Sequence, residues 1–184
     1  EVDADDAVYP ITIDPLATSA SWHVEGNFTS AQLGLSVATA GDVNGDGFSD
    51  ILVGASYFNS LVPNNGQVTL YYGAANGPST TPAWSAQGDT NSISFGHPVA
   101  TAGDVNGDGY SDILIGDNEH TVNGIADVGA VFVFYGSASG LGANGTPANA
   151  DVVLTGILHD DFFGGSVASA GDVNGDGYAD VVVG

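Results

Sequence analysis

The 184-residue chain contains no lysine and no arginine, while 22 aspartate and glutamate residues give it a formal net charge of −22. Nucleic acids and anionic membrane surfaces bind proteins through basic patches, so the sequence excludes both classes of partner. Histidine is the only side chain that could pair with a carboxylate, so the acids must face water or meet metal ions. A solvated acidic surface explains part of this charge, because only nine of the acids lie in the motifs described below.

Cysteine and methionine are also absent, which rules out disulfides and soft metal ligands and suits an extracellular, secreted or cell-surface protein. No run approaches the roughly 20 apolar residues of a membrane helix, so no membrane insertion is expected. No signal peptide is visible, so the chain begins at a processed end or is a fragment. Its 28 glycines and 43% hydrophobic content favour a packed protein made of many short strands and turns.

One ten-residue motif occurs three times, as GDVNGDGFSD, GDVNGDGYSD and GDVNGDGYAD. The first aspartate of each copy stands at 42, 104 and 172, so the copies are separated by 62 and then 68 residues. The similarity extends beyond the motif, because GQVTLYYGAANG after the first copy matches GAVFVFYGSASG after the second. Such a period indicates a repeat architecture in which each repeat is one structural unit.

Each repeat is predicted to hold four short strands. In the first repeat we expect them at Val37–Ala40, Asp50–Val53, Gln67–Tyr72 and Ala83–Ala86. Four strands in about 60 residues are typical of a β-propeller blade, and a β-sandwich or a solenoid is the alternative. The expected organisation is an N-terminal arm at 1–18, an outer strand at 19–26, blade one at 27–88, blade two at 89–156 and a partial blade three at 157–184. The fold class is therefore all-β, with two full blades and part of a third.

The spacing of oxygen-bearing residues in the motif points to a bound hard cation. Asp42, Asn44, Asp46 and Asp50 stand at positions 1, 3, 5 and 9, and the backbone carbonyl of Phe48 stands at position 7. This set of oxygens can wrap one Ca²⁺ ion, whereas Mg²⁺ demands a tighter octahedron and zinc prefers nitrogen and sulfur. An EF-hand is excluded, because position 12 is Val53 in a strand-like run and not a glutamate. The alternative is a surface turn without an ion.

The pattern FG…AGDVNGDGYSDILIG…GAVFVFYG resembles the FG-GAP repeat of integrin α-subunit propellers and of many secreted bacterial proteins. The likeness covers about Ser19 to Gly184, although Leu33-Gly34 replaces FG in the first copy and VGAS and IGDN stand where GAP is usual. The resemblance implies one Ca²⁺ per loop, three in all, on one rim of a propeller. The implied ligands are Asp42, Asn44, Asp46, Phe48 and Asp50; Asp104, Asn106, Asp108, Tyr110 and Asp112; and Asp172, Asn174, Asp176, Tyr178 and Asp180.

Two functions remain open at this point. The first is a Ca²⁺-binding extracellular adhesion or structural module that contacts a protein partner or further copies of itself, for instance as a subunit of a surface filament or matrix. An incomplete ring leaves open strand edges, and residues 19–26 could add a strand to a neighbouring copy. The second is a propeller portion of a larger secreted hydrolase. The first is favoured, because catalytic groups normally occur once whereas these groups repeat in every copy.

Outside the motif, the sequence offers four histidines, two tryptophans and two glycosylation sequons. His23, His97, His120 and His159 share no motif with a nucleophile, so surface or turn positions are expected. The HDD stretch that begins at His159 is predicted to be a polar loop, and an additional metal ligand is the alternative interpretation. Trp22 and Trp84 occupy equivalent places in the repeat, which favours packing over ligand stacking. Asn27 and Asn144 begin glycosylation sequons, which chance alone can produce.

Overall fold

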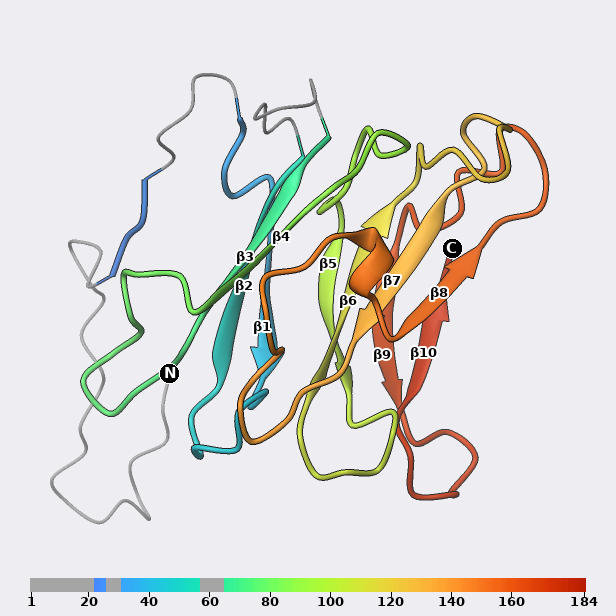
Figure 1. The fold of residues 1–184 in the computed structure, drawn as a ribbon. Helices are drawn as coiled ribbons and strands as arrows, with labels where there is room; N and C mark the ends of the chain where they lie inside the picture. Colours follow the sequence, from blue (N-terminus) through green and yellow to red (C-terminus); the bar gives the residue numbers. More distant parts are fainter. Residues whose placement is uncertain (1–21, 26–30, 57–64) are drawn as a thin grey trace, which may run out of the picture.

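The computed structural model describes residues 22–25, 31–56 and 65–184, and its strands form three antiparallel sheets in chain order (Figure 1). The first sheet contains β1 (Ser36–Gly41), β2 (Asp50–Ala55), β3 (Gln67–Tyr71) and β4 (Trp84–Gln87). The second contains β5 (Val99–Gly103), β6 (Asp112–Asp117), β7 (Ala130–Phe134) and β8 (Val152–Thr155). The third pairs β9 (Val167–Gly171) with β10 (Asp180–Val183). A 3₁₀ turn, η1 (Pro147–Asn149), precedes β8.

The three sheets stand side by side, and their order in space is their order along the chain (Figure 1). Their first strands meet one another, because β1 contacts β5 and β5 contacts β9. These strands carry alanine and glycine where they approach, as in the VATAG sequence of β5, so their backbones can lie close together. The arrangement is all-β, with two four-stranded blades followed by a two-stranded sheet, as the repeat predicts, and not a pair of sheets as in a sandwich.

The hydrophobic core lies between successive blades. Leu70 and Trp84 of the first blade pack with Phe95, Ile113 and Phe132, which follow in the chain. Leu114, on the other face of β6, belongs instead to a second cluster shared with β9 and β10. Because neighbouring residues of β6 serve different interfaces, its central residues 113–116 are apolar without interruption, as expected for a strand buried on both faces.

The two tryptophans make matching contacts in consecutive repeats. Trp84 packs edge-on against Phe134, with ring centroids 5.1 Å apart, and its Nε1 donates to the Ala143 carbonyl at 2.9 Å. Trp22 packs edge-on against Tyr71 at 5.4 Å, and its Nε1 donates to the Ser79 carbonyl at 2.9 Å. Both rings therefore serve packing, as their equivalent places in the repeat predict.

The outer edge of the first blade is covered by the segment between β7 and β8. Gly145 pairs with Ala86 of β4 in a parallel bridge, and the Asn144 side-chain oxygen accepts the Ser85 N–H at 3.1 Å. This contact gives Asn144 a role in joining the blades, whereas its sequon partner Asn27 lies outside the described residues. The expected arm at 1–18 also lies outside them. Of the expected outer strand at 19–26 only residues 22–25 are described, and these form no strand.

Candidate metal centres

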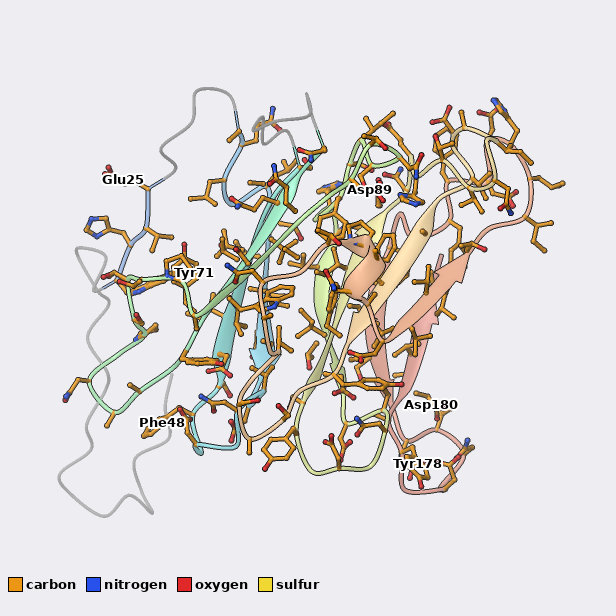
Figure 2. The ribbon with its side chains drawn as sticks, viewed as in Figure 1. Glu25, Phe48, Tyr71, Asp89, Tyr178 and Asp180 are labelled. Carbon is orange, nitrogen blue, oxygen red and sulfur yellow. The ribbon has the colours of Figure 1, made fainter. Side chains whose placement is uncertain are left out.

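Each repeated motif forms the hairpin loop between the first two strands of a blade, and all three loops lie at one end of the molecule (Figure 1). Gly41 of β1 pairs with Asp50 of β2, so the ends of the first loop are held together by the sheet. The pairs Gly103 with Asp112 and Gly171 with Asp180 close the other two loops in the same way. Phe48, Tyr178 and Asp180 mark this end of the molecule in Figure 2.

The first aspartate of each loop organises the backbone around it. Asp42 Oδ1 accepts the N–H groups of Gly45 at 2.7 Å and Asp46 at 3.1 Å, and its Oδ2 accepts that of Gly47 at 2.9 Å. Asp104 and Asp172 accept the corresponding three N–H groups in their own loops. These charge-assisted bonds fix the loop in one curled conformation. Gly45 and Gly47 supply the positive φ angles of 72° and 89° that the curl requires.

The residues at positions 3 and 5 are joined to each other. The Asn44 amide nitrogen donates to Asp46 Oδ2 at 3.0 Å, and Asn44 Oδ1 accepts the Asp46 N–H at 3.0 Å. Asp46 Oδ1 in turn accepts the Phe48 N–H at 2.9 Å. The same pattern holds for Asn106 with Asp108 and for Asn174 with Asp176. Hydrogen bonds within each loop therefore link positions 1, 3 and 5 of each predicted ligand set, at the surface of the molecule.

The aspartate at position 9 lies deepest. Asp50 and Asp112 are 1% and 0% exposed, and each carboxylate accepts two backbone N–H groups. For Asp112 the donors are Val105 at 2.8 Å and Gly136 at 2.8 Å. Burial raises the pKa of Asp50 and of Asp112, although the two N–H bonds to each act in the opposite direction. Hydrogen bonding led by the Gly177 N–H lowers the pKa of Asp172, which is exposed in the third loop.

The donor chemistry of the loops fits a hard divalent cation. Each loop offers only oxygen ligands, and two loops bury a carboxylate in a chain that has no lysine or arginine to neutralise it. An ionised carboxylate has about four acceptor sites, so the backbone bonds leave lone pairs for an ion. In none of the three described loops do the three carboxylates all lie within 4.8 Å of one another. Amide and backbone carbonyl oxygens would have to complete the coordination.

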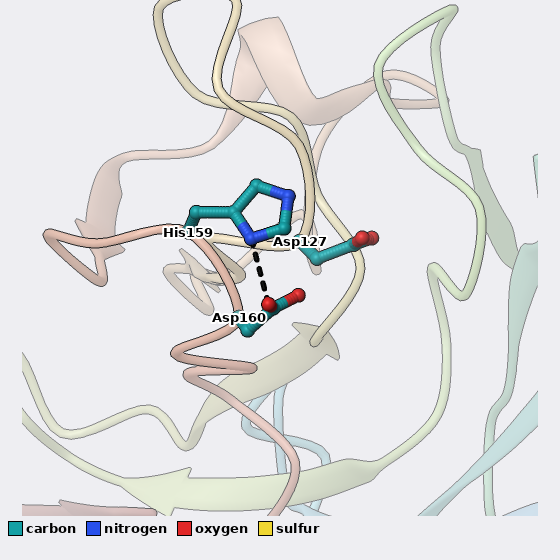
Figure 3. A group of neighbouring side chains, drawn as sticks. All are labelled: Asp127, His159 and Asp160. Carbon is teal, nitrogen blue, oxygen red and sulfur yellow. Dashed lines mark ion pairs between the residues drawn. The ribbon is translucent and has the colours of Figure 1, made fainter.

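Among the described residues, one group of His, Cys, Asp or Glu side chains does gather within 4.8 Å, namely Asp127, His159 and Asp160 (Figure 3). His159 Nδ1 lies 2.7 Å from Asp160 Oδ2, and both side chains are about 60% exposed. The HDD stretch indicated a polar loop here, but nothing in the sequence linked it to Asp127, which precedes β7. Exposed acidic groups of this kind are common in the absence of a metal ion.

The histidines were expected at surface or turn positions, and His120 follows the turn at 118–119 but lies buried. His23, His97 and His159 are exposed, but His120 is buried edge-on against Phe132, with ring centroids 5.3 Å apart. Its Nδ1 lies 3.0 Å from Oδ2 of the buried Asp117. Asp117 also accepts the backbone N–H and the hydroxyl of Ser94, each at 3.0 Å. Asp117 belongs to the IGDN stretch that replaces GAP, so this departure builds a buried polar cluster.

A model of the family described as FG-GAP repeat matches residues 33–71, 95–134 and 163–184, which together make up just over half of the chain. Human integrin alpha-6 is 34% identical over 161 residues, which cover 87% of this chain and 13% of that protein. Integrin alpha-4 of Xenopus laevis is 29% identical over 185 residues, or 96% of this chain and 16% of that protein. Integrin alpha-PS2 of Drosophila melanogaster is 30% identical over 171 residues, 89% of this chain and 12% of that protein.

The chain thus spans less than a fifth of the length of these relatives. Within the part of the chain that the structure describes, no helix has the length and apolar character needed to cross a membrane.

Proposed function

Because the chain belongs to the FG-GAP repeat family, we propose that it is a Ca²⁺-binding extracellular adhesion or structural module. Its three motif loops would each hold one ion, and the blade surfaces would contact a protein partner or further copies of the chain. The observation that carries this proposal is the repetition of one oxygen-lined loop, with the same internal hydrogen bonds, at the same end of three blades.

In the first loop the ion would be held by the side chains of Asp42, Asn44, Asp46 and Asp50 and by the Phe48 carbonyl. The second and third loops would use the matching residues, namely Asp104, Asn106, Asp108, Tyr110 and Asp112, and Asp172, Asn174, Asp176, Tyr178 and Asp180. A bound dication would offset the repulsion among three carboxylates and stabilise the buried charge at position 9. The ion would therefore serve the structure of each blade end and not a reaction.

An extracellular location and an adhesive role are supported by the integrin alpha chains to which the sequence is similar. The lack of lysine and arginine removes every trypsin cleavage site, which suits a long-lived surface or matrix protein. A filament or matrix is one assembly that contacts between copies would build. The net charge of −22 opposes such contacts, so assembly is expected to need Ca²⁺, salt or low pH.

Ion binding is tested by isothermal titration of the metal-free chain with Ca²⁺, for which we expect three ions per chain. Changing both Asp104 and Asp108 to Asn should lower this number to two, because the second loop loses two of its three charges. The matched control changes Glu119 to Gln and Asp160 to Asn, which removes two charges outside the loops and should leave three ions bound. A chain that binds no Ca²⁺, or a control that loses a site, would contradict the proposal.

Association between copies is tested separately by analytical ultracentrifugation in Ca²⁺, in Mg²⁺ and in EDTA. Equal association in EDTA at low salt would show that contacts between copies do not depend on the ions.

A further inference from the structure

The first and second motif loops, residues 42–50 and 104–112, are joined by a reciprocal pair of hydrogen bonds between blades. The Ser111 N–H donates to the Asp42 carbonyl at 2.9 Å, and the Asp42 N–H donates to the Ser111 hydroxyl at 3.2 Å. Asp42 is the residue whose carboxylate organises the first loop. Ser111 directly follows Tyr110, whose carbonyl belongs to the ligand set of the second loop. The pair therefore ties the start of one loop to the ligand-bearing backbone of the next.

An aromatic ring adds a second connection. A Cβ placed on Gly45 would lie 2.6 Å from Cε1 of Tyr110, so this ring rests directly on the Gly45 backbone. The Gly45 N–H is one of the three that the Asp42 carboxylate holds. Movement of Tyr110 would therefore disturb the hydrogen-bonded curl of the neighbouring loop.

A dipeptide after β7 forms the third connection. The Gly136 N–H donates to Asp112 Oδ1 at 2.8 Å, and the Ser137 N–H donates to the Val43 carbonyl at 3.0 Å. Asp112 is position 9 of the second loop, and Val43 is position 2 of the first. One short stretch of backbone thus holds both loops at once.

The junction between the second and third loops is similar but weaker. The Ala179 N–H donates to the Asp104 carbonyl at 2.8 Å, and the Tyr178 ring rests on Gly107 just as Tyr110 rests on Gly45. Alanine stands here in place of Ser111, however, so the hydroxyl that accepts the aspartate N–H is missing. The chain itself therefore contains a natural comparison for the Ser111 contact.

We propose that these contacts make ion binding at neighbouring loops positively cooperative, and that the first and second loops are coupled more strongly than the second and third. This inference rests on the proposed Ca²⁺ binding. An ion that fixes the Tyr110 carbonyl would also fix the Tyr110 ring and Ser111 against the first loop. The first loop would then lose less conformational freedom on binding its own ion.

The charge of the chain alone predicts negative cooperativity between neighbouring loops. Each bound dication makes the acidic chain less negative, so it should weaken the attraction for the next ion. The Asp104→Asn, Asp108→Asn chain separates the two effects. An occupied native second loop carries three carboxylates and one dication, a net charge of −1, and the variant loop also carries −1. Where the native second loop is occupied, charge therefore predicts no change at the first loop; where that loop is still empty, its −3 charge attracts an ion to the first loop more strongly than the −1 of the variant does. The part of the shift that depends on Ser111 isolates contact coupling, because Ser111→Ala removes the hydroxyl that accepts the Asp42 N–H and changes no charge.

The test is a Ca²⁺ titration of the full chain followed by the backbone amide NMR signals of Gly45, Gly107 and Gly175, one for each loop. In the Asp104→Asn, Asp108→Asn chain we expect the Gly45 midpoint to rise at least about fivefold in Ca²⁺ concentration, the lower end of ordinary coupling between sites. In a Ser111→Ala background, which copies the natural Ala179 junction, the same pair of changes should shift the Gly45 midpoint less. Changing Asp172 and Asp176 to Asn should likewise shift the Gly107 midpoint less than fivefold.

The outcomes distinguish the two proposals. If no native loop responds to Ca²⁺, both the proposed function and the coupling are wrong. If all three native loops bind Ca²⁺ but the Gly45 midpoint stays constant or falls in the Asp104→Asn, Asp108→Asn chain, only the coupling is wrong. A Tyr110→Leu chain retains every proposed ligand, so it provides the second test should the double variant fail to fold. In the Tyr110→Leu chain the first loop, whose sequence is unchanged, should bind Ca²⁺ more weakly. An unchanged Gly45 midpoint would overturn the coupling.

Discussion

At the scale of single residues, Gly45 and Gly175 hold the same place in two loops but have different neighbours. Both have positive φ angles, 72° and 77°. A Cβ on Gly45 would meet the Tyr110 ring at 2.6 Å, whereas a Cβ on Gly175 would meet nothing within 4 Å. An alanine at Gly175 would therefore introduce backbone strain alone, whereas an alanine at Gly45 would add a steric clash with the neighbouring blade.

We predict that Gly175→Ala lowers the free energy of unfolding by about 1–2 kcal/mol, the cost of a left-handed conformation for alanine. Gly45→Ala should cost more than this, because the new methyl group must also displace the Tyr110 ring. Urea unfolding of both variants in excess Ca²⁺ measures the difference. Equal losses would mean that Tyr110 moves away freely and does not hold the first loop.

The buried aspartates at position 9 predict a pH dependence. Burial raises the pKa of Asp50 and Asp112, so folding favours their protonated forms. A raised folded-state pKa contributes stability at pH values below the unfolded pKa, and this contribution is lost as the pH rises through the folded pKa. In EDTA the two carboxyls should therefore make the chain less stable at pH 7 than at mildly acidic pH. The exposed Asp172, whose pKa is lowered, acts in the opposite direction.

Urea unfolding in EDTA between pH 4 and pH 7.5 measures this dependence, and Asp112→Asn should make it shallower because that variant has one fewer buried acid to ionise. Excess Ca²⁺ should also flatten the dependence, since a bound cation stabilises the ionised form. An unchanged slope in Asp112→Asn would show that the pH dependence arises from surface charge alone.

At the scale of strands and loops, the repeat in the sequence predicted more of the structure than any single pattern did. The second strand, expected at Asp50–Val53, runs on to Ala55, and the fourth, expected at Ala83–Ala86, is Trp84–Gln87. Alignment of three copies locates strands and loops because each copy must fold in the same way. It cannot set strand ends to a single residue, because those depend on hydrogen-bond partners in neighbouring strands.

Features that occur only once were missed, because contacts between distant residues leave no local signal. His120 was expected at a surface or turn position, and nothing in the sequence indicated that its ring contacts the buried Asp117. Asp127 stands far from His159 in the sequence, and the structure brings them together. The cover that Gly145 provides for the edge of β4 was not foreseen either. The predicted ligand sets lie within single loops, which is why the sequence could propose them.

The phenylalanine in the turn before the second blade and its counterpart before the third blade allow a further prediction. Phe95 is fully buried, and its ring lies 5.6 Å from the Phe132 ring, whereas Phe163 at the entry to the third blade is only partly buried. Phe95→Ala should lower the free energy of unfolding by about 3–5 kcal/mol, the usual cost of removing a buried phenylalanine. Phe163→Ala is the matched control and should cost less. Urea unfolding of both variants in Ca²⁺ compares their losses in free energy of unfolding. Equal losses would contradict the idea that Phe95 fills the main core.

At the scale of the whole molecule, electrostatic repulsion opposes the apolar packing between blades. The core between blades draws the sheets together, while a net charge of −22 with no lysine or arginine repels all parts of the surface. Three Ca²⁺ ions would reduce the net charge only to −16, so their effect on the overall field is small. Their main effect would come from the loops, where three carboxylates lie within a few residues of one another.

This contrast predicts two separable responses. In EDTA, raising NaCl from about 10 mM to about 0.5 M should stabilise the chain against urea, because it shortens the screening length from roughly 30 Å to under 8 Å. At fixed ionic strength, Ca²⁺ should stabilise the chain further and Mg²⁺ should do so less, because Ca²⁺ tolerates varied arrangements of oxygen ligands whereas Mg²⁺ demands a near-ideal octahedron and keeps its waters. If Mg²⁺ and Ca²⁺ gave equal protection, the ions would be acting as diffuse counter-ions, and the loops would not be ion sites. A chain with Asp→Asn changes at positions 1 and 5 of all three loops should keep the NaCl response and lose the Ca²⁺ preference, since only the second depends on the loops.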